Sequence, residues 1–351
     1  SIALHEAGHM LVARRLGISV PKFFVGFGPT LWSRARGSTE YGVKAFPLGG
    51  FVKIEDETQP VGSAERGLLS FVKPWKRILI FIAGPVVNII LGVVILVSMM
   101  MFTPVQSVTT QISSVDSCVS FSNCGAAVAG FLPGDVVVSI DGREISTVSD
   151  LSSRFSPNGS NVVVDRDGVR VPLWVVAGKT GKIGVKLEVV ERQRSFSESV
   201  GVMGSLLWLN LEALADVPGH VPNIVGSVFG GVERSPEGPS SILGVGKTYG
   251  DTAAEVDVSA ESKLVTLLTY SGLFNLGLGF ANLLPLLPLD GGHVVVALVD
   301  SVRKRWSRVR RSVYSPLPYK WVSVFTVVTG SLLVAFMLLV AVADIVSPLK
   351  V

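Results

Sequence analysis

Residues 78–102 read ILIFIAGPVVNIILGVVILVSMMMF and contain no charged side chain. A helix needs about 20 consecutive apolar residues to cross the hydrocarbon core of a bilayer, so this segment predicts a transmembrane span. Two further runs have the same character: residues 264–287, and residues 321–345, where Asp344 is the single charge and lies near the far end. Runs of this kind are typical of a polytopic α-helical membrane protein.

The composition of the 351 residues supports a membrane protein. Hydrophobic residues make up 48% of the chain and charged residues only 17%, against about 25% charged in soluble domains. The mean hydropathy is +0.52. The chain is too apolar for intrinsic disorder, and two cysteines are too few for a disulfide scaffold. The net charge of +4 predicts no nucleic-acid partner, because the basic residues lie beside apolar runs and suit a lipid bilayer.

The chain opens with SIALHEAGHMLVARRLG and has no initiator Met. This segment reads as the last half of a helix whose earlier residues lie before Ser1. We therefore expect four transmembrane helices, of which the first is truncated.

Lysine and arginine in short loops predict the orientation of the spans. Excess Lys and Arg mark the cytoplasmic side of a membrane protein. If four spans alternate, all the basic clusters fall on one side, which should be the cytoplasm, and the segment 105–262 lies outside. The clusters comprise Arg14, Arg15, Lys73, Lys76, Arg77, Arg303, Lys304, Arg305, Arg308, Arg310, Arg311 and Lys320.

The outer segment divides into two parts. Residues 105–190 contain VVVSIDGRE, NVVVDRDGVRVPLWVV and GKIGVKLEVV, which predict short strands joined by Asp-Gly turns in a small, mostly β domain. Cys118 and Cys124 in this part are either inert thiols or close a small loop. Residues 191–262 predict a connector, in which SFSESVGVMGSLLWLNLEAL forms either a helix on the membrane surface or packed structure.

Residues 17–73 contain FFVGFGPTLW and YGVKAFPLGGFVKI, which predict a membrane-associated β-hairpin region beside the first helix. The expected organisation has four parts. They are an N-terminal membrane part at 1–104, a domain at 105–190, a connector at 191–262 and a C-terminal membrane part at 263–351, the last with a basic cytoplasmic loop between its two spans.

The segment His5-Glu6-Ala7-Gly8-His9 carries the strongest chemical signal. Residues i and i+4 share a helix face, so both imidazoles can bind one metal ion while Glu6 stands beside it. Zinc takes such ligands and leaves a position for water, which Glu6 can deprotonate. Ionisable residues inside an apolar helix are costly and usually functional.

A third zinc ligand must come from elsewhere in the membrane region. Asp290 is the carboxylate at the end of the 264–287 run, in NLLPLLPLDGGH at residues 282–293. Pro285 and Pro288 should interrupt the helix, and Gly291 and Gly292 should let the backbone turn tightly. An acid held at a broken helix suits a ligand, so we expect His5, His9 and Asp290 to bind Zn²⁺.

Several motifs now occur in an order that resembles the site-2 protease family of intramembrane zinc metalloproteases. The resemblance is to the bacterial, PDZ-containing members that regulate sigma-factor proteolysis, and it covers nearly the whole chain. The motifs are HEAGH at 5–9, GFGP at 26–29, FPLGG at 46–50, AGPVVN at 83–88 and LDGG at 289–292.

The resemblance implies zinc ligation by His5, His9 and Asp290, with Glu6 as general base. Asn282 matches the asparagine of the family pattern NxxPxPxLDG, which is implicated in holding the substrate chain. Here Leu287 stands where the pattern has its second proline, and Pro288 follows one residue later. For Asn88, in the second span, we prefer a structural role in bonding a neighbouring helix.

The two remaining histidines are weaker candidates. His293 follows Asp290 by three residues and is interpreted as supporting the site or facing the cytoplasm. His220 lies in Pro-Gly-His-Val-Pro at 218–222, which predicts a surface loop.

The outer domain resembles bacterial PDZ domains through AGFLPGD at 129–135, followed by VVVSIDGREI. PDZ folds bind extended peptides at a sheet edge, and in this family the domain is regarded as a size filter for trimmed substrates. The resemblance thus implies a multi-pass protein of the bacterial plasma membrane, with its PDZ domain extracytoplasmic and its active site toward the cytoplasm.

We expect a zinc endopeptidase that cleaves transmembrane segments of single-pass membrane proteins after a first extracytoplasmic cut. By analogy the substrates are anti-sigma factors, in regulated intramembrane proteolysis, or remnant signal peptides. One alternative is a membrane peptidase of the prenyl-protein or heat-shock type, which takes its third ligand from a later Glu. Another is a non-catalytic PDZ-bearing scaffold or sensor with a vestigial metal site.

Overall fold

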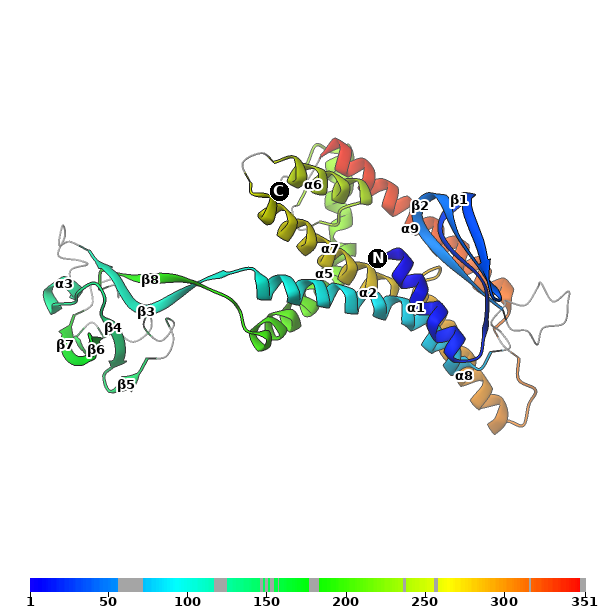
Figure 1. Ribbon diagram of the computed structural model, residues 1–351. Coiled ribbons are helices and arrows are strands. Elements are labelled where there is room, and N and C mark those ends of the chain that lie inside the picture. Colours follow the sequence, from blue (N-terminus) through cyan, green and yellow to red (C-terminus); the bar gives the residue numbers. More distant parts are fainter. Residues whose placement is uncertain are drawn as a thin grey trace. The chain divides into compact units, whose positions relative to one another are not determined.

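The computed structural model in Figure 1 describes residues 1–55, 72–116, 125–145, 148, 151, 155–156, 158–176, 183–235, 238–255, 258–315 and 317–347. It divides into two compact units, one formed by Ser1–Met99 with Phe196–Val351 and the other by Met100–Ser195. The second unit is therefore inserted into the sequence of the first. Cys118 and Cys124 lie outside the described residues.

The first unit is mainly helical. Among the described residues, four helices are long and apolar enough to cross a membrane: α2 (Pro74–Phe102), α5 (Phe196–Phe229), α7 (Ala260–Asn282) and α9 (Tyr319–Val346). Helices α2 and α9 contain two of the apolar runs recognised in the sequence, and α7 contains the third as far as Asn282. The helix predicted as the first span, α1 (Ile2–Arg15), has 14 residues. Together with the β sheets, these helices have the architecture of a membrane protein.

Helix α5 departs from the expectation for the connector. It runs unbroken for 34 residues and includes Pro218 and Pro222, so His220 is half-buried in a helix and the predicted surface loop there is wrong. Near its end, Ile224 packs with Val340 and Ala343 of α9.

The segment between α7 and α9 is also more ordered than a basic loop. The chain leaves α7 after Asn282 and re-enters a helix at Asp290, as the two prolines predicted, but it then continues as the 20-residue helix α8 (Asp290–Val309). The glycines after Asp290 let the start of α8 lie close to the backbone that follows α7. A Cβ on Gly291 would lie 2.3 Å from the carbonyl oxygens of Leu283 and Leu284. A short helix, α6 (Ile242–Ala254), precedes α7.

Small residues bring the central helices together. A Cβ on Gly92 of α2 would lie 2.8 Å from the carbonyl oxygen of Gly272 in α7, and a Cβ on Gly8 of α1 would lie 2.8 Å from that of Ala83 in α2. Glycine at such crossings lets two backbones approach, which is how helices associate in lipid. Helix α2 therefore lies against both the helix with the HEAGH segment and the helix that leads to Asp290.

The predicted hairpin region forms two long antiparallel strands, β1 (Ser19–Arg36) and β2 (Thr39–Glu55). Phe24 of β1 pairs with Phe51 and also with Gly42, since β2 bends back along β1. Among the described residues, the row 50–55 is thus an outer edge of this sheet. Arg14 of α1 donates hydrogen bonds to Thr39 and Tyr41. These bonds hold the sheet on α1.

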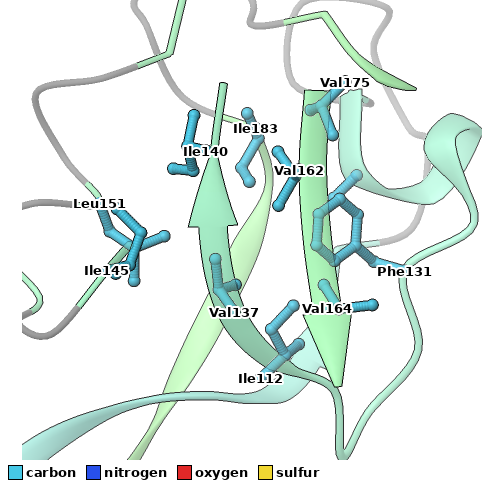
Figure 2. Close-up of a cluster of buried hydrophobic side chains, with 11 residues drawn as sticks. Ile112, Phe131, Val137, Ile140, Ile145, Leu151, Val162, Val164, Val175 and Ile183 are labelled. Carbon is cyan, nitrogen blue, oxygen red and sulfur yellow. The ribbon is translucent and has the colours of Figure 1, made fainter. Parts of the chain in front are cut away.

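The second unit is a β domain built on a path of five strands, in the order β7-β6-β4-β3-β8, with β5 (Arg143–Glu144) paired to β4. The path strands are β3 (Val105–Val115), β4 (Val136–Ile140), β6 (Ser160–Arg166), β7 (Val169–Val175) and β8 (Val185–Arg192), and the helix α3 (Gly125–Ala129) accompanies them. Figure 2 shows their aliphatic side chains and Phe131 converging on one core. The Asp-Gly pairs at 141–142 and 167–168 make tight turns with positive φ at both residues, as the sequence predicted.

An ion pair between a buried carboxylate and a half-buried arginine fixes one corner of this domain. The Asp135 carboxylate is fully buried and accepts hydrogen bonds from Nε and Nη2 of Arg166, at 2.7 and 2.8 Å, and from the backbone N–H of Leu132. The Arg166 guanidinium holds the pKa of Asp135 below its ordinary value of 3.8, since its hydrogen bonds favour the charged carboxylate.

Candidate metal centre

Helix α1 places the two HEAGH histidines on one face. His5 and His9 are one helical turn apart and both are buried, and their Nε2 atoms lie 3.2 Å from each other. Buried imidazoles need partners for their nitrogens. The two Nε2 atoms therefore face a common position, and a third polar group is expected beside it.

Asp290, from the first turn of α8, supplies that third group. Its Oδ2 lies 3.1 Å from Nε2 of His5 and 3.4 Å from Nε2 of His9. Ligand atoms at about 2.0–2.2 Å from one tetrahedral ion are roughly 3.3 Å apart. The three donor atoms thus have the spacing of one face of a zinc tetrahedron, with the fourth position left for water or substrate.

The other ring nitrogen of each histidine also has a partner. Nδ1 of His9 donates to the carbonyl oxygen of Ile80, at 2.7 Å, so in the neutral imidazole Nε2 is the unprotonated nitrogen. Nδ1 of His5 lies 3.1 Å from Nδ2 of Asn88, whose buried Oδ1 has no partner among the described residues. Turning this amide lets Oδ1 accept the Nδ1–H of His5. Both histidines then present Nε2 to a metal, held by α2 in the way outer groups orient metal ligands.

Space for an ion is kept by Gly84 of α2. A Cβ at this position would lie 2.3 Å from Nε2 of His9 and 2.8 Å from Nε2 of His5. A zinc ion binds about 2.0–2.1 Å from such nitrogens. Glycine thus leaves open a position that any other residue would fill, and the donor set, the ring orientations and this opening all fit Zn²⁺.

Glu6 lies next to the first ligand, where its side chain meets the sheet. A Cβ on Gly50 of β2 would be 2.8 Å from Cγ of Glu6. Among the described residues, the Glu6 carboxylate forms no hydrogen bond or ion pair. This half-buried acid beside the metal position is thus available to a water or to a substrate.

The helix that carries Asp290 is anchored by a buried ion pair. Nη1 of Arg77 in α2 lies 2.7 Å from Oδ2 of Asp300 in α8, and Oδ1 of Asp300 accepts the backbone N–H of Leu317. Both side chains are buried. The pair holds α8 against the helix that also carries Ile80 and Gly84.

Asn282 and His293 are not part of the three-donor group. Asn282 is the last residue of α7 and is half-buried. His293 stacks on Phe81, with ring centroids 4.8 Å apart. Of the described residues, the group able to hold a metal comprises His5, His9 and Asp290.

Sequence reasoning did not assign Gly84 or Ile80 a part in the site. AGPVVN was recognised as a motif, but its glycine faces the ligands only because α2 packs against α1. Asn88 does bond a neighbouring helix, as expected, and its partner there is a zinc-binding candidate. An amide inside an uncharged span was the signal that could have indicated this.

Two buried imidazoles and a carboxylate at tetrahedral spacing, with a free acid beside them, define a zinc hydrolase set among the helices of a membrane protein. The family model for peptidase family M50 matches residues 1–316. The chain belongs to this family, the site-2 protease family, and it is a zinc metalloendopeptidase whose cofactor is Zn²⁺.

Individual relatives agree with this assignment. The zinc metalloprotease Rip1 of Mycobacterium tuberculosis is 34% identical over an alignment of 392 positions, which covers all of this chain and 95% of the relative. Rip1 of Mycolicibacterium smegmatis is 32% identical and covers the whole chain and 96% of the relative. The probable membrane metalloprotease ARASP2 of Arabidopsis thaliana is 32% identical over 86% of the chain and 69% of the relative.

Proposed function

We propose that this protease cleaves transmembrane segments of single-pass membrane proteins after a first extracytoplasmic cut, in regulated intramembrane proteolysis. One observation carries the proposal: three donor atoms 3.1–3.4 Å apart lie among apolar helices of the chain. Candidate substrates are membrane anti-sigma factors and remnant signal peptides.

In this mechanism His5, His9 and Asp290 hold the zinc ion. When bound, Zn²⁺ polarises the scissile carbonyl and makes a water molecule acidic. Glu6 accepts the proton of the attacking water and returns it to the leaving amine, as general acid–base groups do. Its free carboxylate suits this task.

Substrate positioning is assigned to Asn282 and to the sheet edge at 50–55. Gly50 lies against the Glu6 side chain, so a chain added along this edge would pass beside the proposed base. An edge strand offers unpaired backbone groups to an extended peptide. Such pairing would hold an unwound substrate segment in reach of the site.

We place the Met100–Ser195 unit on the extracytoplasmic side of the membrane. We place the metal centre toward the cytoplasmic side. The unit is a PDZ-like domain, which we assign as a filter that excludes substrates not yet trimmed. The basic residues of α8 and of the start of α2 favour the cytoplasmic side. By this orientation the protein is a multi-pass protein of the bacterial inner membrane.

Helix α5 then lies along the outer surface of the membrane. If α9 begins at the basic side, its last turns are outside, and α5 packs Ile224 against them. The beginning of α5 follows the outer domain, so both its ends are external. In a chain with Cys118 and Cys124 changed to serine, single cysteines at Gly201 and Phe229 should both react with an impermeant maleimide added outside. Protection of one of them would show that α5 crosses the bilayer.

The function is tested with Glu6→Gln in purified, zinc-loaded protein. Loss of a general base lowers turnover by about 10²–10⁴-fold, while zinc stoichiometry and elution volume stay unchanged. Glu261→Gln, an acid at the start of α7, serves as the matched control and should cleave normally. Candidate substrates are supplied both intact and already trimmed outside the membrane. Unchanged turnover by Glu6→Gln would rule out the mechanism, and equal cleavage of both substrate forms would rule out the filter.

A further inference from the structure

A basic pocket lies between the start of α2 and the second half of α8, away from the metal centre. Its volume is about 520 Å³, and Figure 1 shows both elements. It is lined by Lys73, Pro74, Trp75, Ser301, Lys304, Arg305 and Arg308.

The charge of this pocket is uncompensated in the described part of the chain. Four of its seven lining residues are cations and none is an acid. None of these four cations forms an ion pair with a described residue, and the nearby Asp300 is taken by Arg77. Two guanidinium groups beside two ammonium groups favour an oxyanion, which arginine binds through paired N–H donors.

The sequence places the pocket at the depth of the lipid headgroups. Trp75 lies three residues before the apolar run of α2 begins at Ile78, and the residue is 52% exposed. Tryptophan gathers at the boundary between hydrocarbon and water, and Lys and Arg gather on its cytoplasmic side. A ligand in this pocket therefore meets the bilayer at the level of its phosphates.

Helix α8 adds an independent indication of lipid. Large apolar side chains recur along it every three or four residues and are exposed, namely Val295, Leu298, Val302, Trp306 and Val309. An apolar stripe flanked by arginines is typical of a helix that lies in the membrane interface. Acyl chains next to this stripe would lead directly to a headgroup held by Arg305.

We propose that this pocket binds the phosphate-bearing headgroup of an anionic phospholipid, with the apolar stripe of α8 lying in the same leaflet. The ligand class is a phosphodiester with acyl chains, such as phosphatidylglycerol. The proposal does not depend on the substrate of the protease. It requires only that the chain resides in a bilayer.

The test uses the full chain, purified in detergent and stripped of lipid, with bound lipid counted by native mass spectrometry. Phosphatidylglycerol and phosphatidylcholine are titrated separately into three proteins: the native chain, the double variant Arg305→Gln/Arg308→Gln, and the control Arg310→Gln/Arg311→Gln. Both variants remove two positive charges from neighbouring positions, but Arg310 and Arg311 do not line the pocket. The pocket variant and the control therefore lose the same amount of nonspecific attraction to an anionic lipid.

Each lost cation should weaken binding of the anionic lipid about fivefold. We expect the pocket variant to bind phosphatidylglycerol about 30-fold more weakly, while the control stays within about threefold of the native chain and phosphatidylcholine binding is unchanged. Zinc stoichiometry shows that α8, which carries Asp290, remains in place. If the pocket variant does not fold, Lys73→Gln on α2 should give the fivefold loss alone.

Equal losses in the pocket variant and the control would overturn the proposal, because surface charge alone would then explain binding. A separate arm adds inorganic phosphate at constant ionic strength, which keeps screening equal. Displacement of the lipid by millimolar phosphate would assign the pocket to a soluble anion and also overturn the proposal. Retention of the lipid supports it.

Discussion

Replacing Gly84 by alanine should remove zinc while leaving the helices in place. The added Cβ would lie 2.3 Å from Nε2 of His9 and 2.8 Å from Nε2 of His5. A bound zinc ion lies about 2.0–2.1 Å from both nitrogens. The methyl group would therefore intrude on the space beside both nitrogens in which the ion must bind.

The expected loss of zinc affinity depends on how far the histidine side chains can move away from the added methyl group. His9 is fixed by its bond to the Ile80 carbonyl, and that carbonyl belongs to the same helix as Gly84. Loss of a group that merely orients a ligand costs about 10–100-fold in metal affinity. Direct obstruction should reach at least about 100-fold, and turnover should fall with zinc content.

The assay is zinc titration of the purified protein against a competing chelator, together with cleavage of a trimmed substrate. Gly92→Ala in the same helix is the control, because its Cβ would lie 2.8 Å from the Gly272 carbonyl oxygen and from Leu276. That variant should lower the thermal midpoint but still bind about one zinc per folded chain. Normal zinc affinity in Gly84→Ala would refute the placement of the ion between the two imidazoles.

Two further predictions concern the ion pairs Arg77–Asp300 and Asp135–Arg166. Arg77→Met leaves the Asp300 carboxylate buried without its cation, so we expect the free energy of unfolding to fall by about 3 kcal/mol or more. In denaturant unfolding, the double variant Arg77→Met/Asp300→Leu should recover much of this loss. A double variant less stable than the single one would contradict the prediction. In the inserted domain, the lowered pKa of Asp135 means that its pairing with Arg166 stabilises the fold fully above the ordinary value of 3.8 and is lost as pH falls below it. Hydrogen exchange of β4 and β6, corrected for intrinsic rates, should therefore rise on acidification in the native chain and change less in Asp135→Asn.

The features that could be predicted from sequence are those that depend on residues close together in the chain. Uninterrupted apolar runs indicated α2, α7 and α9, since crossing a bilayer depends only on length and polarity. The turns at Asp141 and Asp167 followed from Asp-Gly pairs, because these residues accept positive φ. The spacing of HEAGH likewise depends on one helical turn.

The second half of α5 and all of α8 were missed because breaker and charge signals outweighed periodicity. The glycine and prolines around His220 predicted a loop, yet α5 passes through them. In α8 the basic residues were interpreted as a topological signal, although Leu298, Val302 and Trp306 already had helical spacing. Hydrophobic periodicity was the better guide there.

The surroundings of the metal position could not have been predicted from spacing alone. Gly84, the Ile80 carbonyl and Asn88 act on the histidines only because α1 and α2 cross at Gly8. Such a crossing depends on the fit of two helix surfaces, which the motif itself does not encode. Asp290 could be chosen because acids are rare in the apolar regions.

The insertion of one unit into the other has a consequence for biosynthesis. The two histidines leave the ribosome first, and the carboxylate that joins them follows about 280 residues later. At about 5–20 residues per second, translation separates these events by roughly 15–60 s. During that interval the Met100–Ser195 unit is already complete, so each newly made molecule carries its inserted domain before it can cut any peptide.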